Sequence, residues 1–507
     1  MLDWKAVAGV MGALLVALGA ALAVPALYAL AAGEAAWAAF GGVALGSLAG
    51  GGALWRALRP REELRTREGF AIVALAWLLL SLVGALPWVL AGVLASYTDA
   101  FFEVMSGFTT TGATILGGAG TPAIEAVPDS FLLWRSLTHW LGGMGIIVLT
   151  IAVLPMLGVG GMQLFRAEVP GPTADKLTPR VTETAKRLWA IYVALTVLQA
   201  LLLLPAMSPF DAVNHAMATL ATGGFSTENG SVGQYGSDYV EWVVTAFMVL
   251  AGMNFALHYR LLHRDGTVFR NTELRAYGAI VLGATALLTL ALWQPSGEAL
   301  PEAVTLDGEV VAGRGATGSD DAVALEAELP REVVRYERFG DALRTAAFQA
   351  AAIVTTTGFA TADYEVWPPF AVAVIFGLFF VGGMAGSTGG GVKVVRVLLI
   401  LKNSFREMRQ LVHPHAILPL RLDHRVVPDG VMGNVLSFIV LYVGLIGIGT
   451  LGMGLVGLDL LSAFSVTFSC VGNVGPAFGA MGPTEAYTAI PAVGKWVLSF
   501  LMMAGRL

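Results

Sequence analysis

The sequence predicts an all-α integral membrane protein. We expect two extra N-terminal transmembrane helices, followed by four pseudo-repeats of helix, half-membrane helix, re-entrant loop and helix around one axis. Of the 507 residues, 56% are hydrophobic and only 13% are charged, whereas a soluble domain carries about 25% charged residues. Apolar runs of about 20 residues, the length that crosses a bilayer, recur along the chain. A short glycine-containing motif also recurs four times between these runs.

The first two crossings are predicted within residues 1–57. Residues 1–32 are apolar and a second apolar stretch follows at once, so we expect a retained first crossing rather than a cleaved signal peptide. The single cysteine, Cys470, excludes an intrachain disulfide and a thiolate metal cluster. Later apolar runs that fit a bilayer crossing are 70–93, 188–204, 243–257 and 431–456.

Charge placement predicts the orientation of the chain. Basic residues gather at 56–67, 166–187, 260–275 and 393–425, whereas connections 115–130, 226–239 and 476–490 contain no Lys or Arg. The positive-inside rule assigns the basic clusters and the N-terminus to the cytoplasm. Four semi-apolar stretches would break this pattern as full crossings, so we expect each to enter and leave from the outer face. These stretches are 98–114, 209–225, 340–359 and 459–475.

Each re-entrant stretch opens with an aspartate and reaches a glycine 12 to 17 residues later. Aspartate at such a start predicts a helix N-cap, because its carboxylate accepts the unpaired N–H groups of the first turn. A helix of about ten residues rises about 15 Å, half of the hydrocarbon core. The pairs are Asp99 with Gly112, Asp211 with Gly223, Asp341 with Gly358, and Asp459 with Gly475.

The sequences after these half-membrane helices suit a filter for a dehydrated cation. Irregular backbone at that depth is tolerated only where it faces protein or a water-filled cavity. Four such strands around one pore present rings of carbonyl oxygens that replace an ion's water shell. One motif alone would more often be a helix end or a buried turn, but the four copies recur at separations of 111, 135 and 117 residues. The candidate filter residues are Thr110, Thr111, Gly112, Ala221, Thr222, Gly223, Thr356, Thr357, Gly358, Asn473, Val474 and Gly475.

At these residues the chain resembles the TrkH-type subunits of the Trk/Ktr/HKT superfamily of potassium transporters. The resemblance covers nearly the full length, and it is most specific at 106–114, 139–149, 221–227, 355–364 and 472–476. It implies helix–pore helix–filter loop–helix repeats and channel-like potassium uptake across a bacterial inner membrane. It also implies a homodimer and a cytosolic nucleotide-binding regulatory partner of the TrkA kind. One filter glycine per repeat, in place of a longer T-V-G-Y-G ladder, predicts looser discrimination, with passage of Rb⁺ and some Na⁺.

The predicted domains are the N-terminal pair at 1–57 and pore repeats at 69–157, 186–262, 275–402 and 430–507. The third repeat contains an acidic external insertion, 295–338. Residues 295–340 hold ten acids and four bases, and 4 − 10 = −6 equals the net charge of the whole chain. The insertion is interpreted as a solvated loop or as a cation-attracting collar. The fourth repeat stops about twelve residues into its last span, so the resemblance predicts a truncated final helix.

A glycine-rich stretch interrupts the last helix of the third repeat. Six of the ten residues 382–391 are glycine, each costing about 1 kcal/mol in a helix interior, so a loop is favoured over a kinked helix. A phosphate cradle is disfavoured because the spacing before Lys393 is not that of a P-loop. The resemblance implies an intramembrane gating loop under the filter. The candidate gate residues are Gly382, Gly383, Gly386, Ser387, Thr388, Gly389, Gly390, Gly391 and Arg506.

Arg506 lies inside the final apolar run, where a charge is costly and suggests a function. The resemblance implies that it faces the pore below the filter as an electrostatic barrier; the alternative is a side chain that snorkels to the inner interface. Glu103 is expected to brace the filter or to cap hydrogen bonds locally. Lys495 is predicted to be an outer-interface anchor. The histidines are assigned to satisfied or interfacial positions (His139, His215, His258) and to a cytosolic basic face that meets the partner (His413, His415, His424).

Two other functions compete with a gated channel-like translocator. A proton- or sodium-coupled potassium symporter is the alternative, but the filter positions carry no ionisable side chain and the spans show no paired acids. A membrane enzyme is disfavoured, because the chain has no H-E-x-x-H or G-x-G-D pattern and no nucleophile with a base at usable spacing. No nucleotide fingerprint is present either. We therefore expect K⁺ as transported ion, no cofactor in this chain and no nucleic-acid partner.

Overall fold

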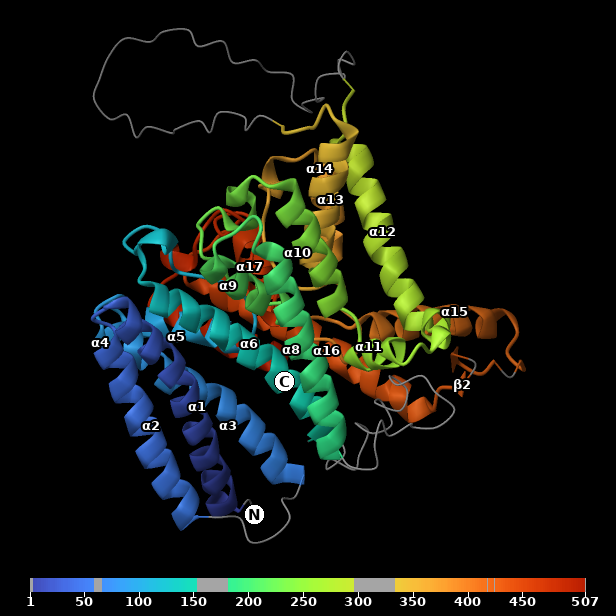
Figure 1. Cartoon of the computed structure of the whole chain (residues 1–507). Helices are drawn as coiled ribbons and strands as arrows, with labels where there is room; N and C mark the ends of the chain where they lie inside the picture. The colour runs from blue at the N-terminus through green and yellow to red at the C-terminus, as the bar shows by residue number, and fades with distance from the viewer. Residues whose placement is uncertain are drawn as a thin grey trace, which may run out of the picture.

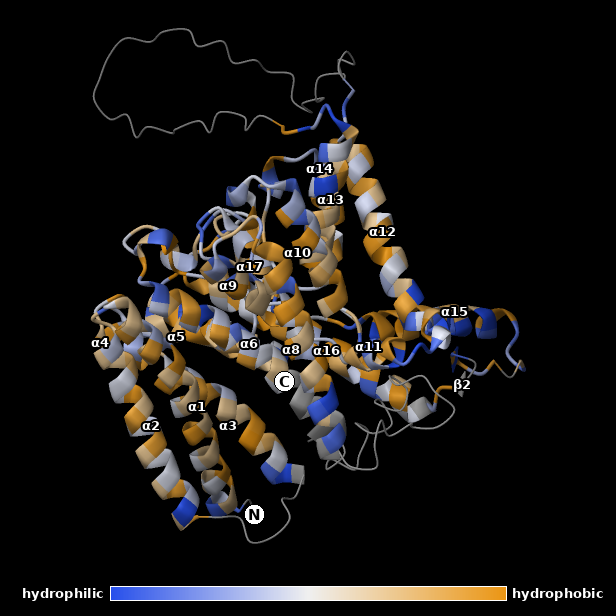
Figure 2. Cartoon of the chain, viewed as in Figure 1, coloured by the Kyte–Doolittle hydropathy of each residue, from blue (hydrophilic) through white to orange (hydrophobic). Residues whose placement is uncertain are grey.

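The protein is described here by a computed structural model over residues 3–58, 66–152, 181–295, 333–416, 418–423 and 425–506. It is an all-α membrane protein, as predicted, with one two-stranded hairpin (β1 Arg421–Leu422 and β2 Arg425–Val426) in the described part (Figure 1). Within these ranges, six helices are long and apolar enough to cross a membrane, or seven if one bent pair counts as a span. Their outer faces are largely hydrophobic (Figure 2), which suits contact with lipid.

The first two helices form a tightly packed pair. Helices α1 (Trp4–Ala32) and α2 (Trp37–Ala57) lie side by side (Figure 1). A Cβ atom added to Gly12 would lie 2.8 Å from the carbonyl oxygen of Gly51, and one added to Gly51 would lie 2.7 Å from that of Gly12. Small residues let helix backbones approach closely where lipid provides no hydrophobic drive for association. The predicted first crossing is therefore a helix, α1, that packs tightly against the second crossing, α2.

The remaining helices form the four predicted repeats, each with a short helix between two flanking segments. Repeat 1 contains α3 (Thr66–Gly84), α4 (Leu86–Leu90), α5 (Tyr97–Phe108) and α6 (Asp129–Ala152). Repeat 2 contains α8 (Val181–Leu203), α9 (Pro209–Leu220), α10 (Asp238–Ala251) and α11 (Phe255–Leu262). Repeat 3 contains α12 (Thr272–Leu292), α13 (Phe339–Val354), α14 (Pro369–Leu378) and α15 (Val394–Val412). Repeat 4 contains α16 (Asp429–Leu455), α17 (Leu460–Gly472) and α18 (Ala492–Arg506).

The predicted aspartate caps are correct for one short helix only. Asp459 caps α17 by accepting from the backbone N–H of Ser462 at 3.1 Å. In α5 and α9 the cap is instead a serine three residues earlier, Ser96 and Ser208. The aspartates Asp99 and Asp211 occupy the first helical turn, where a negative charge complements the helix dipole. In α13 no side chain caps the start, and Asp341 again lies in the first turn.

Two helices break where the chain reaches the middle of the protein. The predicted loop in repeat 3 is present, because no helix forms between Leu378 and Val394; the kinked-helix alternative is wrong. The prediction that residues 243–257 form one continuous crossing is also wrong. Helices α10 and α11 are separate, and their axes are bent by 100°. Asn254 caps α11 by accepting from the N–H of Ala256 at 2.8 Å, so the turn is stabilised locally.

Several predictions concern residues outside the described ranges. Most of the acidic insertion, residues 296–332, is among them, as are 59–65 and 153–180, with part of the basic clusters. His424 and Leu507 are also outside. The solvated-loop and collar interpretations of the insertion therefore stay predictions.

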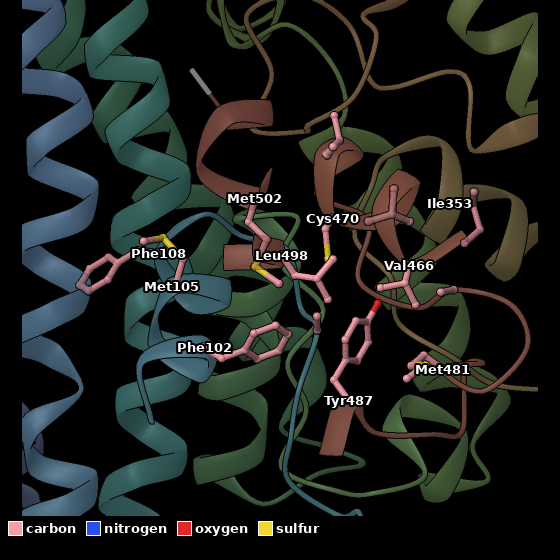
Figure 3. Close-up of a cluster of buried hydrophobic side chains, with 14 of the residues drawn as sticks. Phe102, Met105, Phe108, Ile353, Val466, Cys470, Met481, Tyr487, Leu498 and Met502 are labelled. Atoms are coloured by element: carbon pink, nitrogen blue, oxygen red, sulfur yellow. The ribbon is translucent and has the colours of Figure 1, made fainter. Parts of the chain in front are cut away.

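A buried hydrophobic cluster joins the last repeat to the first. Side chains of α5 (Phe102 and Met105) meet those of α17 and α18 (Cys470, Leu498 and Met502) in it, as Figure 3 shows. Cys470 is a free, buried thiol in this cluster. Phe101 of the same cluster stacks on Trp496 with ring centroids 4.3 Å apart. The four repeats thus close into a ring, which places their loops around a common centre.

Candidate functional site

The four short helices α5, α9, α13 and α17, one in each repeat, end in the same backbone geometry. One residue at each end is left-handed, with φ of 52° at Thr110, 55° at Thr222, 57° at Thr356 and 53° at Asn473. The N–H of each bonds the carbonyl three residues back, and the next N–H bonds the carbonyl five residues before itself. These are the two hydrogen bonds of a Schellman motif. A left-handed β-branched residue is strained, and three threonines share this strain, which is typical of functional sites.

The sequence prediction for repeat 2 is displaced by one residue. Two positions after the left-handed residue, each strand has a glycine of positive φ: 80° at Gly112, 80° at Gly224, 77° at Gly358 and 101° at Gly475. The equivalent of Gly112 is therefore Gly224 and not Gly223, and Ala221 precedes the matched positions. Repeat 2 contains two adjacent glycines, and the sequence pattern alone does not distinguish between them.

The four glycines form one closed ring of contacts. A Cβ atom added to Gly112 would overlap the carbonyl oxygen of Gly223 in the next strand. The same holds for Gly224 against Thr357, Gly358 against Val474 and Gly475 against Thr111. Each strand therefore packs its glycine against a carbonyl of the following strand, in the order 1-2-3-4-1. The structure thus brings eleven of the twelve predicted filter residues into one four-stranded constriction; Ala221 lies just before it.

A cavity of about 110 Å³ lies on one side of this ring and is lined by all four ring glycines. Glu228 and Glu485 also line it. Burial raises the pKa of Glu228 above its ordinary value, and the negative charge of Glu125 adds a smaller effect in the same direction. The connection that holds Glu228 belongs to the group without Lys or Arg, which the positive-inside rule predicts to lie outside. Arg135 also lines the cavity, but its charge is paired with the buried Glu103, and acidic groups beside a narrow constriction favour cations there.

Side-chain hydrogen bonds stabilise strands 1, 3 and 4 of the constriction. In strands 1 and 3 two threonine hydroxyls pair, Thr109 with Thr111 at 2.8 Å and Thr355 with Thr357 at 2.7 Å. The Asn473 amide donates to the Thr111 hydroxyl at 3.0 Å and so ties strand 4 to strand 1. The threonine pairs therefore stabilise strands 1 and 3 internally, and the Asn473–Thr111 bond fixes strand 4 against strand 1.

Glu103 both caps hydrogen bonds of the loop that follows α5 and braces that loop through Arg135. Its carboxylate accepts from the N–H of Ile115 at 3.0 Å and from the Thr114 hydroxyl at 2.9 Å. It also forms a buried salt bridge of 2.8 Å with Arg135 of α6, whose Nη1 donates to the carbonyl of Ser226 at 2.8 Å. Because Ser226 follows strand 2, the pair connects the filter loops of repeats 1 and 2.

Lys495, predicted to be an outer-interface anchor, forms an ion pair between two repeats; its place relative to the membrane interface stays a prediction. Its Nζ forms a 2.6 Å salt bridge with Asp99 at the start of α5, and the lysine side chain is 8% exposed. The tertiary fold brings together two residues almost 400 positions apart, and the ion pair fastens repeat 4 to repeat 1. It lies beside the stacked pair Phe101 and Trp496.

The glycine-rich loop lies against the inner ends of the filter helices. The N–H of Gly390 donates to the Thr356 hydroxyl at 2.6 Å, and the Thr388 hydroxyl donates to the carbonyl of Leu220 at 3.0 Å. A Cβ atom on Gly390 would overlap the carbonyl oxygen of Gly472. The loop thus touches the ends of α9, α13 and α17. The predicted gate residues Gly382, Gly383, Gly386, Ser387, Thr388, Gly389, Gly390 and Gly391 all lie in this loop.

Two anchors of this loop were not predicted. The first anchor is the break between α10 and α11, which exchanges two backbone hydrogen bonds with the loop. The N–H of Met384 in the loop donates to the carbonyl of Gly252 at 2.9 Å, and the N–H of Phe255 donates to the carbonyl of Gly386 in the loop at 3.1 Å. The buried Glu273 of α12 accepts from the N–H of Ala385 at 2.8 Å. Gly252 and Asn254 inside the apolar run 243–257 were the available signal for the break.

Arg506 is buried at the end of α18, with 5% of its surface exposed. Its Nε and Nη2 have no hydrogen-bond partner among the described residues. The preceding Gly505 packs against the carbonyl of Val471 near the end of α17, so the arginine lies close to the inner end of strand 4. A snorkelling side chain is therefore not what the fold shows.

The three membrane histidines have different surroundings. His215 pairs with the Ser226 hydroxyl at 3.0 Å, and His258 with the carbonyl of Leu250 at 2.9 Å. His139 was also expected to be satisfied or interfacial, but it is fully buried with neither ring nitrogen paired to a described residue. No group of three or more His, Cys, Asp or Glu in the described part could hold a metal ion.

Comparisons with known proteins agree with this architecture. A family model described as TrkH, cation transport protein, matches residues 37–280 and 317–507. The chain is 39% identical to the Trk system potassium uptake protein TrkH of Halomonas elongata, over 98% of this chain and 95% of that protein. It is 37% identical to the Escherichia coli K12 protein of the same name, over 100% of this chain and 97% of that protein. The crystal structure of the potassium transporter TrkH from Vibrio parahaemolyticus superposes with a TM-score of 0.83 at 33% identity, covering 100% of this chain and 97% of that chain. The chain belongs to the TrkH family of cation transport proteins.

Proposed function

We propose that this protein takes up potassium by a channel-like route through the four-stranded ring. The observation that carries the proposal is the closed cycle of contacts in which the glycine of each strand meets a carbonyl of the next. Such a ring of oxygens replaces the hydration shell of a cation. Potassium as the ion follows from the relatives, which are named as potassium uptake proteins.

The filter in this proposal comprises Thr110–Gly112, Thr222–Gly224, Thr356–Gly358 and Asn473–Gly475. Gly224 joins the predicted set, and Ala221 supports it from below. Each strand supplies a carbonyl next to a ring glycine of its neighbour. No ring position carries an ionisable side chain, which favours passive conduction over proton-coupled symport. No enzymatic activity is proposed, since the relatives are named as transport-system proteins.

Current reversal separates conduction from coupling. In planar bilayers with purified protein and a tenfold potassium gradient, we expect reversal about 58 mV from zero, close to the potassium equilibrium potential, because channel-like flux follows the electrochemical gradient. A pH gradient of about one unit should leave that potential unchanged. A matching shift with pH would instead support a proton-coupled symporter, and a shift with the sodium gradient a sodium-coupled one.

The glycine-rich loop and Arg506 form the gate in this proposal. The loop is held under the strands by single hydrogen bonds to Thr356, Leu220 and Gly252 and by the buried Glu273 carboxylate. The positive charge of Arg506, near the inner end of strand 4, repels cations. Neutral hydrogen bonds contribute about 1 kcal/mol each and one to a charged group about 1.5–3 kcal/mol, so a partner on the cytosolic side must supply several kcal/mol to displace the loop.

Removing the loop should open the pathway. The N–H of Gly382 bonds the carbonyl of Val392 at 2.8 Å, so the flanking segments already meet and deletion of 382–391 closes the chain with little strain. We expect the deletion to raise the potassium current about tenfold, equivalent to about 1.4 kcal/mol of lost closed-state contacts. Single-channel recording measures the open probability, whose rise should account for the larger current. Thr388→Ala, which loses only the hydroxyl contacts, should give a smaller increase in the same direction, and an unchanged current in both variants would contradict the gate assignment.

We also propose the wider setting implied by the family. The relatives belong to a Trk system, a multi-component assembly by its name. The protein is proposed to form a homodimer in the bacterial inner membrane, with its N-terminus cytoplasmic and a TrkA-like nucleotide-binding subunit below. The repeat boundaries 69–157, 186–262, 275–402 and 430–507 are kept as working limits. Light scattering of the purified protein in detergent should give twice the chain mass.

A further inference from the structure

Filter strand 2 lacks a support that the other strands have. The position after the left-handed residue carries a side chain in three strands, Thr111, Thr357 and Val474, but is Gly223 in strand 2. The threonine pairs that hold strands 1 and 3 are impossible here, since their counterparts in strand 2 are Ala221 and Gly223. Yet the carbonyl of Gly223 is one of the four that contact a ring glycine.

The imidazole of His139 fills the space of the missing side chain. A Cβ atom added to Gly223 would overlap the Nδ1, Cγ and Cε1 atoms of this ring. The ring is fully buried and stacks on Phe225 of the same strand, with centroids 4.1 Å apart and planes at 18°. Neither ring nitrogen has a partner among the described residues, so the imidazole acts as a flat wall rather than as part of a hydrogen-bond network.

Neighbouring turns of α6 fix this wall in place. One turn before His139, the Arg135 guanidinium lies 4.1 Å from the Phe225 ring centre and bonds the Ser226 carbonyl at 2.8 Å. One turn after it, a Cβ atom on Gly143 would lie 2.9 Å from the Cα of Ala221. Residues four apart share one face of a helix. Helix α6 thus contacts strand 2 before, at and after Gly223. The imidazole of His139 therefore cannot shift without moving the helix.

We propose that His139 is a positioning residue for ion selectivity, whose ring holds the carbonyl of Gly223 at the radius that the potassium filter requires. The inference rests on the proposed function and adds a support that repeat 1 lends to strand 2. Interiors of proteins are close-packed, and removal of a buried ring leaves a space into which neighbours relax only partly. A strand that relaxes backwards widens or distorts one side of the ring, and discrimination between K⁺ and Na⁺ falls.

The test is a double-variant cycle measured as relative sodium permeability in reconstituted vesicles. His139→Ala removes the wall, and Gly223→Ala adds a methyl group that collides with it. Each single variant should raise the Na⁺/K⁺ permeability ratio by about threefold to tenfold, whereas the double variant should return towards the wild-type ratio because the new methyl group occupies the vacated space. Leu141→Ala, a truncation of a partly exposed side chain on the same helix, is the matched control and should keep the wild-type ratio.

Each outcome decides the inference. A wild-type ratio in His139→Ala, or a double variant whose effect is the product of the single effects, overturns it. If His139→Ala cannot be purified as a folded protein, His139→Asn, which retains a smaller flat group, enters the same cycle. Wild-type vesicles without potassium flux would refute the proposed function instead, and this result is seen before any variant is compared.

Discussion

Gly358→Ala is expected to abolish most of the discrimination between potassium and sodium. The glycine has φ of 77°, where an alanine is strained by about 1–2 kcal/mol. Its new Cβ atom would also overlap the carbonyl oxygen of Val474 in the next strand. Both effects push strands 3 and 4 apart. We expect the K⁺/Na⁺ permeability ratio to fall at least about tenfold, as for a change of about 1.4 kcal/mol in relative barrier height.

The control for this variant is another glycine of repeat 3. Gly283 lies in α12 with nothing within 4 Å of an added Cβ atom, so Gly283→Ala should leave the ratio unchanged. Bi-ionic reversal potentials measure both variants in the same bilayers. Gly223→Ser and Gly358→Ser are expected to act in the same direction as Gly358→Ala. An unaltered ratio in Gly358→Ala would remove strand 3 from the filter.

Arg135→Gln is expected to cause the largest loss of stability of any single substitution in the filter support. Arg135 and Glu103 are 2% and 0% exposed and their charged atoms lie 2.8 Å apart. Removing one partner of a buried ion pair leaves an uncompensated charge and costs about 3–5 kcal/mol. The substitution also removes the link to Ser226, so we expect weaker selectivity together with a lower midpoint of thermal unfolding in detergent.

The double substitution separates charge from packing. Glu103→Gln combined with Arg135→Gln leaves no buried charge and should recover a large part of the lost stability. Glu183→Gln is the matched control, because its ion pair with Lys186 is 48% and 69% exposed on its two sides. An exposed pair contributes about 0–1 kcal/mol, so the unfolding midpoint should hardly move. Equal effects of Arg135→Gln and Glu183→Gln would show that the buried pair has no special role.

Local patterns were sufficient for the repeated unit. Apolar length, the side on which basic residues gather, and a recurring glycine after a short helix are properties of neighbouring residues, and they predicted the helical membrane fold and the four loops. The glycine-rich loop was predicted for the same reason, since six glycines in ten residues disfavour a helix whatever surrounds them. Apart from the displaced register of repeat 2, these features needed no contact between distant parts of the chain.

Predictions failed where a side chain's role depended on a distant partner. The sequence did not predict the partner of Lys495, which is Asp99, 396 positions away. His139 was expected to be satisfied or interfacial, yet it forms a wall behind Gly223. The choice between Gly223 and Gly224 also required the backbone angles of all four strands.

The sequence by itself therefore determined the class of the protein, its repeats and the segments that form the four-stranded ring and the glycine-rich loop. The tertiary structure alone decided which glycine of repeat 2 joins the ring, which helix supports which strand, and where the buried charges find partners. The physical reason is the range of the interactions. Helix formation and bilayer crossing depend on residues a few positions apart, whereas the width of the ring depends on close packing between strands more than 100 residues apart.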